Sequence, residues 1–326
     1  MDRTTGSPQA HWYRSEDAHA ESVVRAAYAP EARNRHMHWP AAAGSFVVAE
    51  LDGRVVGRAC MDAVWPPFAE IQNMEVLPPF RGRGAGGALV DECLRRIAQM
   101  GFVAAFLQTF PENVQAHRLY ARKGFLIAAK GEMLRLVRFI GMPVLDGFLH
   151  EHPLATYGAS ADKPSEWSLE WSDWPTGDRL QLALSGGSCQ RDSDGYGPAL
   201  RGVSLATGKA AFSAQLTGPK VCARGGDVAL SLELTNTSSD PLQIWARLLL
   251  PQGCMAAGKW ENTGPAETIA PGASLRTDFA VTLGPELDLA ALRGAAFPSV
   301  PLTVEVFAGD TSFWLSRSIK MREEKG

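Results

Sequence analysis

The stretch that decides the fold is Asn73-Met-Glu-Val-Leu-Pro-Pro-Phe-Arg-Gly-Arg-Gly-Ala-Gly-Gly-Ala-Leu89. An apolar strand runs into a proline turn, an arginine and alternating glycines follow, and a helix then begins. Such a junction collects unbonded backbone N–H groups and the positive end of a helix dipole at one point. The sequence therefore predicts a pyrophosphate-binding loop. Arg81 and Arg83 can add charge-assisted hydrogen bonds to phosphate oxygens, and the glycines let an anion approach the backbone.

The glycine spacing alone does not name the ligand. Gly82-x-Gly84-x-x-Gly87 also satisfies the pattern of dinucleotide-binding folds, which is weak by itself. That interpretation expects an acidic residue at the end of the next strand, about 20 positions on. The predicted strand 102–109 ends without one, and no Gly-Lys-Ser/Thr follows the loop as an ATP-binding loop requires. Both nucleotide interpretations therefore fail on context.

The next 40 residues are predicted to form a helix, a strand and a second helix, in that order. A helix over 85–100 places Leu89, Cys93 and Ile97 on one face. A buried strand over 102–109 follows. A second helix is then predicted, which Asn113 can cap and Gly124 can end.

Together these segments resemble the GNAT superfamily of acyl-CoA N-acyltransferases. The first signature of that family, Arg/Gln-x-x-Gly-x-Gly/Ala, is met by Arg81, Gly84 and Gly86. The second, Asn-x-x-Ala-x-x-Leu-Tyr-x-x-x-Gly-Phe, is met at each stated position from Asn113 to Phe125, and Val76-Leu-Pro78 fits the preceding strand end. The resemblance covers about residues 10–140 and says nothing about the rest of the chain.

The resemblance implies a fold, a co-substrate and a set of contacts. The fold would be an α+β GNAT fold, with a mixed sheet that splays at the loop and helices on both faces. The co-substrate would be acetyl-CoA, and no metal is expected. The residues expected to bind acetyl-CoA are Val76, Leu77, Arg81, Gly82, Arg83, Gly84, Ala85, Gly86, Gly87, Asn113 and Tyr120.

Acyl transfer to an amine also needs an acid for the leaving thiolate and a base for the amine. In the family a tyrosine at the position of Tyr120 lies near the coenzyme sulfur, so Tyr120 is the candidate general acid. The alternative is a helix tyrosine packed on the core. Asn113 can cap its helix, contact the coenzyme, or do both.

Glu70 and Glu75 are the candidate bases, because the family often uses a strand carboxylate here, directly or through water. Strict alternation puts their side chains on opposite faces of the strand, and a bulge would change that count. Glu75 is favoured because it is closer to the acyl end. Either residue could instead be a solvated or structural carboxylate. Asn73, on the face of Glu75 by the same count, could align the acceptor amine.

The acceptor pocket is expected from residues 31–44 and the segment near Trp65. Trp39 and Trp65 would suit an apolar or planar acceptor, or could be ordinary packing residues. His36-Met-His38 lacks a third ligand, so a pocket or surface role is favoured over a metal site.

The remaining elements of the first part are expected in the following order. A short strand lies at 12–14, and a helix runs from about 15 to 30. A hairpin turns at Asp52-Gly53 between strands 45–51 and 54–64. Another strand runs over 70–77, and a closing hairpin joins 125–129 to 132–139.

The second half has a different pattern. We predict a GNAT domain over 1–140, a connector over 141–165 and a β-sandwich domain over 166–326. Turn residues separate the alternating strand-like runs 168–174, 179–185, 210–216, 228–236, 242–250, 274–282, 302–307 and 313–319, and only 286–293 is predicted helical. The pattern favours an antiparallel sandwich that is loosely similar to immunoglobulin-like domains. The apolar run 139–149 is expected to pack between the domains.

Composition and charge limit the kinds of partner and compartment that are expected. The 326 residues are 45% hydrophobic and 21% charged, which suits two domains with real cores. Residues 1–150 carry 17 basic and 15 acidic side chains and residues 151–326 carry 15 and 20, so nucleic acid is not an expected partner. We predict no membrane segment. We also predict a cytoplasmic location, because the five scattered cysteines fit a reducing compartment.

Two functions follow from the sequence. The first is an acetyl-CoA-dependent N-acetyltransferase acting on a small-molecule or peptide amine, with a sandwich that recognises the acceptor or holds a homodimer together. The second is a non-catalytic acyl-CoA-binding or interaction protein, whose sandwich binds a carbohydrate or protein partner. Six of the nine tryptophans lie in the second half, where Trp167 and Trp171 share a strand face. They would stack on sugar rings if exposed, or fill a core or domain seam if buried.

Overall fold

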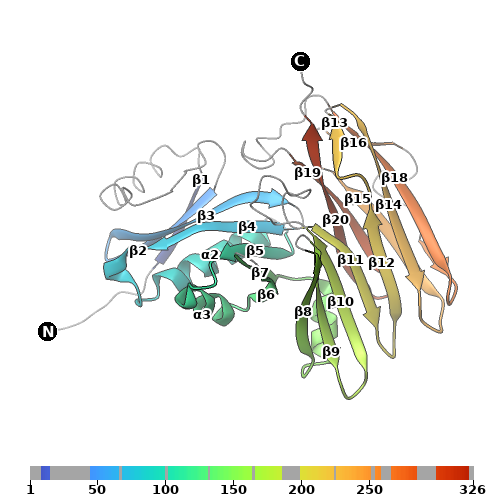
Figure 1. Cartoon of the computed structure of the whole chain (residues 1–326), viewed down its shortest axis with the longest axis horizontal. Coiled ribbons are helices and arrows are strands. Elements are labelled where there is room, and N and C mark those ends of the chain that lie inside the picture. Colours follow the sequence, from blue (N-terminus) through green and yellow to red (C-terminus); the bar gives the residue numbers. More distant parts are fainter. Residues whose placement is uncertain are drawn as a thin grey trace.

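The computed structural model describes residues 9–14, 45–65, 68–99, 102–130, 133–163, 166–185, 199–223, 225–250, 254–257, 266–284 and 299–322. These residues form two lobes that lie side by side (Figure 1). A helix-covered sheet makes the first lobe, and strand-rich layers make the second.

The first lobe is built on a seven-stranded sheet in the order β1-β2-β3-β4-β5-β7-β6. Its only parallel pairing among the described strands joins β4 to β5, so the sheet is mixed. The strands are β1 Gln9–Arg14, β2 Ser45–Leu51, β3 Arg54–Trp65, β4 Phe68–Val76, β5 Ala104–Thr109, β6 Leu126–Ala129 and β7 Leu134–Phe139. The predicted hairpin at Asp52-Gly53 is confirmed, and both turn residues have positive φ.

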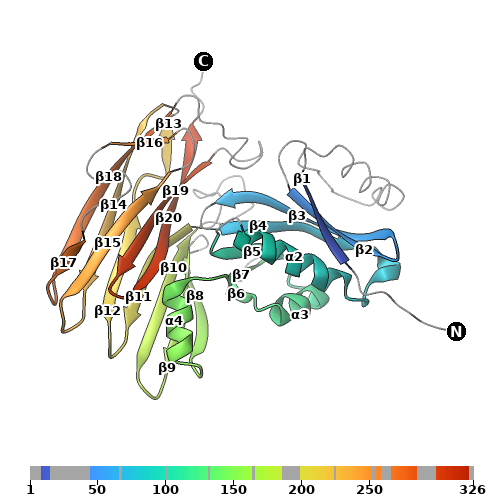
Figure 2. The same cartoon turned by 180° about the vertical axis from the view of Figure 1, so that it is seen from behind.

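Two helices of this lobe are described, and both lie on the same side of the sheet (Figures 1 and 2). Helix α2, Ala85–Gln99, buries Leu89, Val90, Cys93 and Ile97 against the strands. Helix α3, Val114–Arg122, contributes Tyr120 to the same core. The helix predicted for residues 15–30 lies outside the described residues.

The pairing between β4 and β5 is short. It joins Phe68–Glu70 to 104–106 and goes no further. Beyond Glu70, β4 continues to Val76 along β3, while β5 continues to Thr109 along β7. The two central strands therefore diverge into a wedge, which confirms the predicted splay.

Strand β4 also carries a bulge. Arg58 pairs with Glu75, but Cys60 pairs with Gln72, so β4 has one residue more than β3 over this interval. Asn73, within the bulge, has a φ of 48°, a left-handed conformation that asparagine tolerates better than most residues. The bulge changes which side chains share a face.

The second half contains two further sheets. The larger has the order β16-β18-β14-β12-β11-β10-β9-β8, and the smaller the order β13-β20-β19-β15-β17. The strands are β8 Thr156–Lys163, β9 Glu166–Asp173, β10 Asp178–Ser185, β11 Ala199–Ala206, β12 Ala211–Thr217, β13 Val221–Ala223, β14 Asp227–Asn236, β15 Leu242–Leu249, β16 Cys254–Ala257, β17 Glu267–Ile269, β18 Ser274–Leu283, β19 Ser299–Ala308 and β20 Thr311–Arg322.

These two sheets share one apolar core. Alternate residues of β12, β14 and β18 are buried, as expected for strands with one covered face. Phe212 of β12 stacks on Phe313 of β20 at 5.5 Å between ring centroids, and the Leu200 N–H of β11 donates to Ser316 Oγ of β20 at 3.1 Å. Two layers of strands therefore face each other; an immunoglobulin-like arrangement of them stays a prediction.

Several details differ from the sequence-based expectations. The connector predicted over 141–165 contains two regular elements that the sequence did not suggest, helix α4, Pro143–Glu151, and strand β8. Helix α4 buries Val144, Leu145 and Phe148 in the core that the two sheets share. Strands β11, β13, β16 and β17 were not predicted either. The helix predicted over 286–293 lies outside the described residues.

The two lobes meet through apolar and aromatic side chains. Phe68, Ala104 and Val137, at the paired end of β4 and β5, belong to the same buried cluster as Trp167 and Trp171 of β9. The Phe139 ring lies edge-on to Trp171 at 6.2 Å, and the Arg135 guanidinium lies 5.3 Å above the Trp167 ring. Both tryptophans are buried, so the interpretation that they stack on sugar rings is wrong, and the seam interpretation is confirmed.

No helix within the described ranges is long and apolar enough to cross a membrane.

The seam makes a prediction about stability. Trp171 is 4% exposed, whereas Trp174, three residues further along, is 84% exposed. We expect Trp171→Ala to lower the free energy of unfolding by about 3–5 kcal/mol, the usual cost of removing a buried aromatic side chain. Trp174→Ala is the matched control and should change it by no more than about 0.5 kcal/mol. Urea unfolding followed by circular dichroism measures both, and equal small losses would show that Trp171 does not hold the lobes together.

Candidate active site

The predicted anion-binding loop lies where β4 ends at the open side of the wedge. A short 3-10 helix, Pro78–Phe80, follows β4 and leads into Arg81. Gly82 and Gly84 then take φ values of 75° and 91°, which only glycine adopts without strain. These two positive φ values turn the backbone into the first turn of α2.

The start of α2 presents unbonded donors. Its first intrahelical hydrogen bond runs from the Ala88 N–H to the Gly84 carbonyl at 3.1 Å. The N–H groups of Ala85, Gly86 and Gly87 precede that bond, and in an α-helix they have no carbonyl one turn back to bond to. They point out of the helix end together with the positive end of the dipole, which favours an anion there.

Two arginines flank this helix end, and both side chains are exposed. Arg81 Nε donates to the Val76 carbonyl at 2.9 Å, so this side chain braces the turn in addition to carrying charge. Arg83 lies 3.9 Å from Asp52 of the β2–β3 turn and 5.8 Å from the Phe80 ring centroid. Both guanidiniums remain near the loop with donors available for an anion.

Position 86 requires a glycine because of packing, whereas position 84 requires one because of its positive φ. A Cβ atom on Gly86 would lie 3.3 Å from Leu119 Cδ2 of α3, so the missing side chain lets the two helices approach. Lys123 at the end of α3 forms an ion pair with Asp91 of α2, and Arg138 donates to the Lys123 carbonyl. These contacts fix α3 beside the loop.

The capping role predicted for Asn113 is confirmed. Its side-chain oxygen accepts a hydrogen bond from the Ala116 N–H at 3.2 Å at the start of α3. Gly124, with a φ of 77°, follows the helix, where glycine commonly ends one. The local signals of this motif therefore describe its local structure correctly.

Tyr120 lies inside the core that α2 and α3 share. Its side chain is 6% exposed, and its ring lies 5.7 Å from that of Phe125. Removal from water, with a smaller contribution from nearby Cys93, raises the pKa of Tyr120 to about 12. The hydroxyl therefore keeps its proton at all physiological pH values and is available only as a donor or a neutral acceptor.

The structure corrects the assignment of Glu70 and Glu75 to opposite faces. Ala69 and Ile71 pack on the α2 side before the bulge, and Met74 and Val76 pack on that side after it. The extra residue in the bulge thus shifts the alternation by one. Glu70 and Glu75 therefore share the face that α2 does not cover.

Two residues on that face were not found from the sequence. Gln72 Nε2 donates to Glu70 Oε2 at 2.7 Å, and Arg58 Nη2 lies 3.8 Å from Glu75 Oε2. Arg58 is only 2% exposed. The hairpin at Asp52-Gly53 fixes the start of β3, but the bulge that places Arg58 opposite Glu75 has no local sequence signal. Arg58 therefore required the structure.

The two carboxylates differ in their surroundings. Glu70 is 6% exposed and lies at the closed end of the wedge, where β4 still pairs with β5. Glu75 is partly exposed and lies one residue from the end of β4, next to the loop. Glu75 is therefore the carboxylate that lies nearer the anion site and is more open to a ligand.

The predicted acceptor-site residues are only partly described. Asn73 is exposed and lies in the bulge between the two carboxylates. Trp65 ends β3, where its backbone pairs with Phe68, and its side chain lies outside the described residues, as do residues 15–44 with Trp39, His36 and His38. Within the described ranges, no group of three or more His, Cys, Asp or Glu side chains is arranged to hold a metal ion.

The candidate residues lie on both faces of the sheet, on either side of the wedge between β4 and β5. Tyr120 belongs to the α2 face, the carboxylates belong to the opposite face, and the wedge between β4 and β5 separates the two. A ligand anchored at the start of α2 can place one end in this wedge.

Comparison with known proteins identifies relatives of the first part of the chain. Residues 11–125 match the acetyltransferase (GNAT) family, so the chain contains a GNAT acetyltransferase domain. An uncharacterised N-acetyltransferase of Mycobacterium tuberculosis is 32% identical over 83 residues, which are 26% of this chain and 53% of that protein. Another, from Archaeoglobus fulgidus, is 35% identical over 81 residues, 23% of this chain and 55% of that protein.

The chain thus spans about half the length of the curated relatives that it matches. Among solved structures, an IAA acetyltransferase from Bacillus cereus aligns over 41% of this chain and all of its own, with 21% identity and a TM-score of 0.32. These matches concern the first lobe.

Proposed function

We propose that this protein, which contains a GNAT acetyltransferase domain, transfers an acetyl group from acetyl-CoA to a primary amine by direct attack. One observation carries the proposal: a glycine loop with two positive φ values opens α2 at the mouth of the β4–β5 wedge. The acceptor is a small-molecule or peptide amine. The free thiols of Cys60, Cys93, Cys222 and Cys254 suit a cytoplasmic site of action.

The coenzyme would use two features of the wedge. Its pyrophosphate would accept hydrogen bonds from the N–H groups of Ala85, Gly86 and Gly87, with Arg81 and Arg83 beside it. The edge of β4 from Ile71 to Val76 is not paired with β5, so its backbone can bond the amides of an extended pantetheine arm as a strand edge bonds a peptide. The thioester would then lie inside the wedge.

Tyr120 would stabilise the leaving thiolate. A thiol has a pKa of about 8.5 in water, well below the pKa of about 12 that burial gives to Tyr120. Full proton transfer to the sulfur is therefore uphill. The hydroxyl would act by donating a hydrogen bond that strengthens as charge develops on sulfur, and the released thiolate would take its proton from water.

Glu75 would accept the proton of the attacking amine, directly or through water. It lies nearer the loop than Glu70 and is the more exposed of the two. Arg58 would hold the Glu75 carboxylate in place from the neighbouring strand, and Gln72 would hold that of Glu70. Asn73, exposed in the bulge between them, would help to orient the acceptor.

The second half would support acceptor recognition or assembly, including a homodimer. It packs at the closed end of the wedge, so it holds the strands whose divergence makes the site. A second function, a non-catalytic acyl-CoA-binding protein, is favoured by the burial of Tyr120 in the core, which suits a packing role. We favour the first function because Glu70 and Glu75 share one face of β4 beside the wedge, and a protein that only binds the coenzyme has no need of carboxylates there.

Turnover separates the two functions. The purified full-length protein is incubated with acetyl-CoA and a panel of primary amines, and free thiol is measured over time. We expect continuous thiol release that depends on the amine, with the acetylated product identified by mass spectrometry. Binding of acetyl-CoA without thiol release across the panel would support the non-catalytic function instead.

The loop gives a matched pair of glycine variants. Gly84→Val should abolish acetyl-CoA binding, because valine resists a φ of 91° and the turn that aims the donors is lost. Gly177→Val imposes similar strain at a φ of 79° in a distant turn of the second half. Isothermal titration should therefore show loss of binding only in the Gly84→Val protein, even where both variants lose similar stability. Tight binding by folded Gly84→Val protein would place the phosphates elsewhere.

The tyrosine makes a kinetic prediction. Tyr120→Phe should lower kcat by about 10²–10³-fold, the usual cost of removing one hydrogen-bond donor to a developing negative charge, and leave acetyl-CoA affinity within a few fold. Because its pKa is raised to about 12, loss of the Tyr120 proton should cause no fall in kcat as the pH rises from 8 to 10. Steady-state rates across this range measure both effects, and an active Phe variant would remove Tyr120 from the chemistry.

The carboxylates can be compared with each other. Glu75→Gln should lower kcat by about 10²-fold or more if Glu75 takes the amine proton, while Glu70→Gln keeps the Gln72 contact and should have a much smaller effect. The defect in Glu75→Gln should shrink as the pH rises, since more of the amine is then already deprotonated. A larger loss in Glu70→Gln would move the base to the closed end of the wedge.

A further inference from the structure

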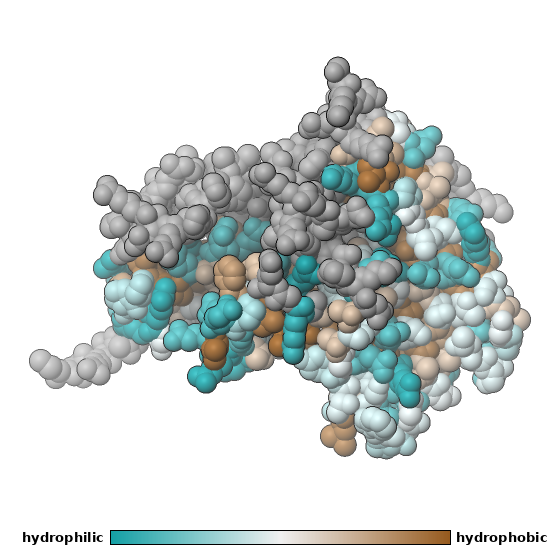
Figure 3. Space-filling view, viewed as in Figure 1, coloured by the Kyte–Doolittle hydropathy of each residue, from teal (hydrophilic) through white to brown (hydrophobic). Residues whose placement is uncertain are grey.

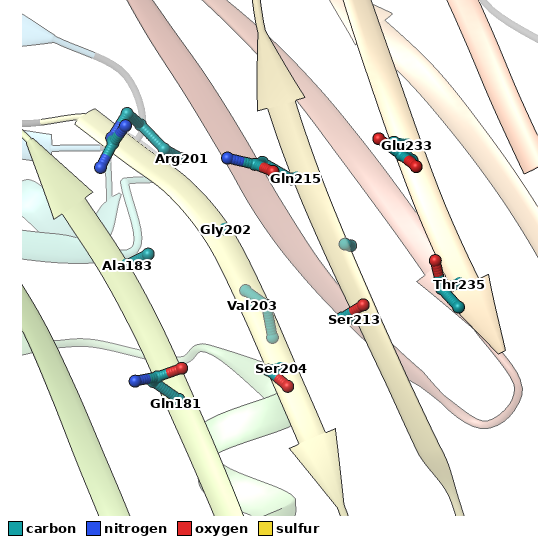
Figure 4. Close-up of a pocket in the computed structure, with 11 residues that line it drawn as sticks. Gln181, Ala183, Arg201, Gly202, Val203, Ser204, Ser213, Gln215, Glu233 and Thr235 are labelled. Carbon is teal, nitrogen blue, oxygen red and sulfur yellow. The ribbon is translucent and has the colours of Figure 1, made fainter. Parts of the chain in front are cut away.

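The outer face of the larger sheet in the second half contains a hollow. It has a volume of about 320 Å³ and is formed by β10, β11, β12 and β14. Figure 4 shows its side chains on one side of these four neighbouring strands. Much of this side of the second half is hydrophilic or near neutral (Figure 3). The volume falls within the range of small-molecule sites.

Small residues make the floor of the hollow. Gly202 of β11 pairs with Ala183 of β10 and with Gln215 of β12. A Cβ atom on Gly202 would lie 3.2 Å from the Ala214 carbonyl oxygen, which leaves little room for a larger residue. The sheet is therefore hollowed where a side chain would ordinarily stand.

Hydrogen-bonding groups make the walls. Gln181, Ser204, Ser213, Gln215 and Thr235 supply two amides and three hydroxyls, and Gln215 extends toward β11 (Figure 4). Glu233 of β14 also lines the hollow, on the far side from Arg201, and its carboxylate can accept hydrogen bonds from the hydroxyls of a ligand (Figure 4). Each amide or hydroxyl can both donate and accept. Such a set matches the hydroxyl groups of a polyhydroxylated ligand, and no aromatic ring lines the hollow to bind an apolar one.

A positive charge closes one end. The β10–β11 register shifts at Ala183/Leu184, which places Arg201 in a bulge beside the floor. Arg201 Nε is buried and has no hydrogen-bond partner among the described residues, and Arg201 Nη2 lies 3.5 Å from Glu166. The Arg201 guanidinium thus keeps donors beyond its long contact with Glu166, and these donors can bind the anionic group of a ligand.

We propose that this hollow binds a small polyhydroxylated anion, such as an acidic or phosphorylated sugar, with its anionic group on Arg201 and its hydroxyls on the amide and hydroxyl walls. The site lies on the second half and does not depend on the acetyltransferase function. It also differs from the tryptophan-stacking site that the sequence suggested, since Trp167 and Trp171 are buried at the seam.

Titration of the full-length protein with four compounds tests the proposal. The compounds are D-glucuronate, D-glucose 6-phosphate, D-glucose and inorganic phosphate, with binding followed by saturation-transfer NMR and calorimetry. We expect at least one of the two sugar anions to bind about tenfold or more tightly than glucose and than phosphate, because only these compounds offer both features. The better of the two identifies the anionic group as carboxylate or phosphate.

Variants assign the binding to the hollow. Arg201→Gln should remove the preference for the sugar anion over glucose, whereas Arg179→Gln, an exposed arginine of β10 outside the hollow, should leave it unchanged. Gln215→Leu keeps Arg201 and should weaken sugar-anion binding several fold. Thermal unfolding checks the fold of each variant, and acetyl-CoA affinity should be the same in all of them.

Three outcomes would overturn the proposal. The first is that wild-type protein at millimolar concentration binds neither sugar anion. The second is that inorganic phosphate alone binds as tightly as the sugar anions. The third is that folded Arg201→Gln protein still prefers the sugar anion to glucose. If Arg201→Gln does not fold, the wild-type preference together with Gln215→Leu decides the question.

Discussion

The rest of the structure depends on where β4 stops pairing with β5. Three residue pairs, 68–70 with 104–106, hold these strands together, and beyond them each strand pairs only with its outer neighbour. This divergence exposes one edge of β4 inside a folded sheet. The glycine loop and the start of α2 lie at the mouth of the opening, so an anion held there can direct the remainder of its molecule into the wedge.

The second half supports the closed end of that wedge. Phe68, Ala104 and Val137 lie in one buried cluster with Trp167 and Trp171, so the strands are held together on the side away from the loop. An open wedge between two central strands loses backbone hydrogen bonds that an ordinary sheet would have, and apolar burial at the seam offsets part of that loss. The second lobe thus packs against the closed end of the wedge.

Local signals predicted the parts of the fold that short segments determine. The loop at Arg81–Gly87, the Asn113 cap, the Asp52-Gly53 hairpin and most strands of the second half were predicted from residues close together in the sequence. Helix α4 was missed because its segment carries glycines and prolines, which are typical of a connector, although Pro143 lies at the first helical turn, where proline is favoured. Strand β11 was missed because Gly202 weakens a strand pattern.

What could not be predicted depends on register between distant strands. The bulge at Asn73 moves Glu70 and Glu75 to one face and places Arg58 beside Glu75, and neither result follows from alternation along β4. The burial of Trp167 and Trp171 likewise depends on how the lobes pack. Contacts between residues a few positions apart can be predicted from the sequence. Contacts that depend on the register between distant strands cannot.

The most direct test of the account is a crystal structure of the full-length protein with acetyl-CoA. We expect the pyrophosphate to accept hydrogen bonds from the N–H groups of Ala85, Gly86 and Gly87. We expect the thioester to lie between β4 and β5, with Tyr120 on one side and Glu75 on the other. Acetyl-CoA bound outside the wedge, or with its pyrophosphate away from the start of α2, would contradict the account.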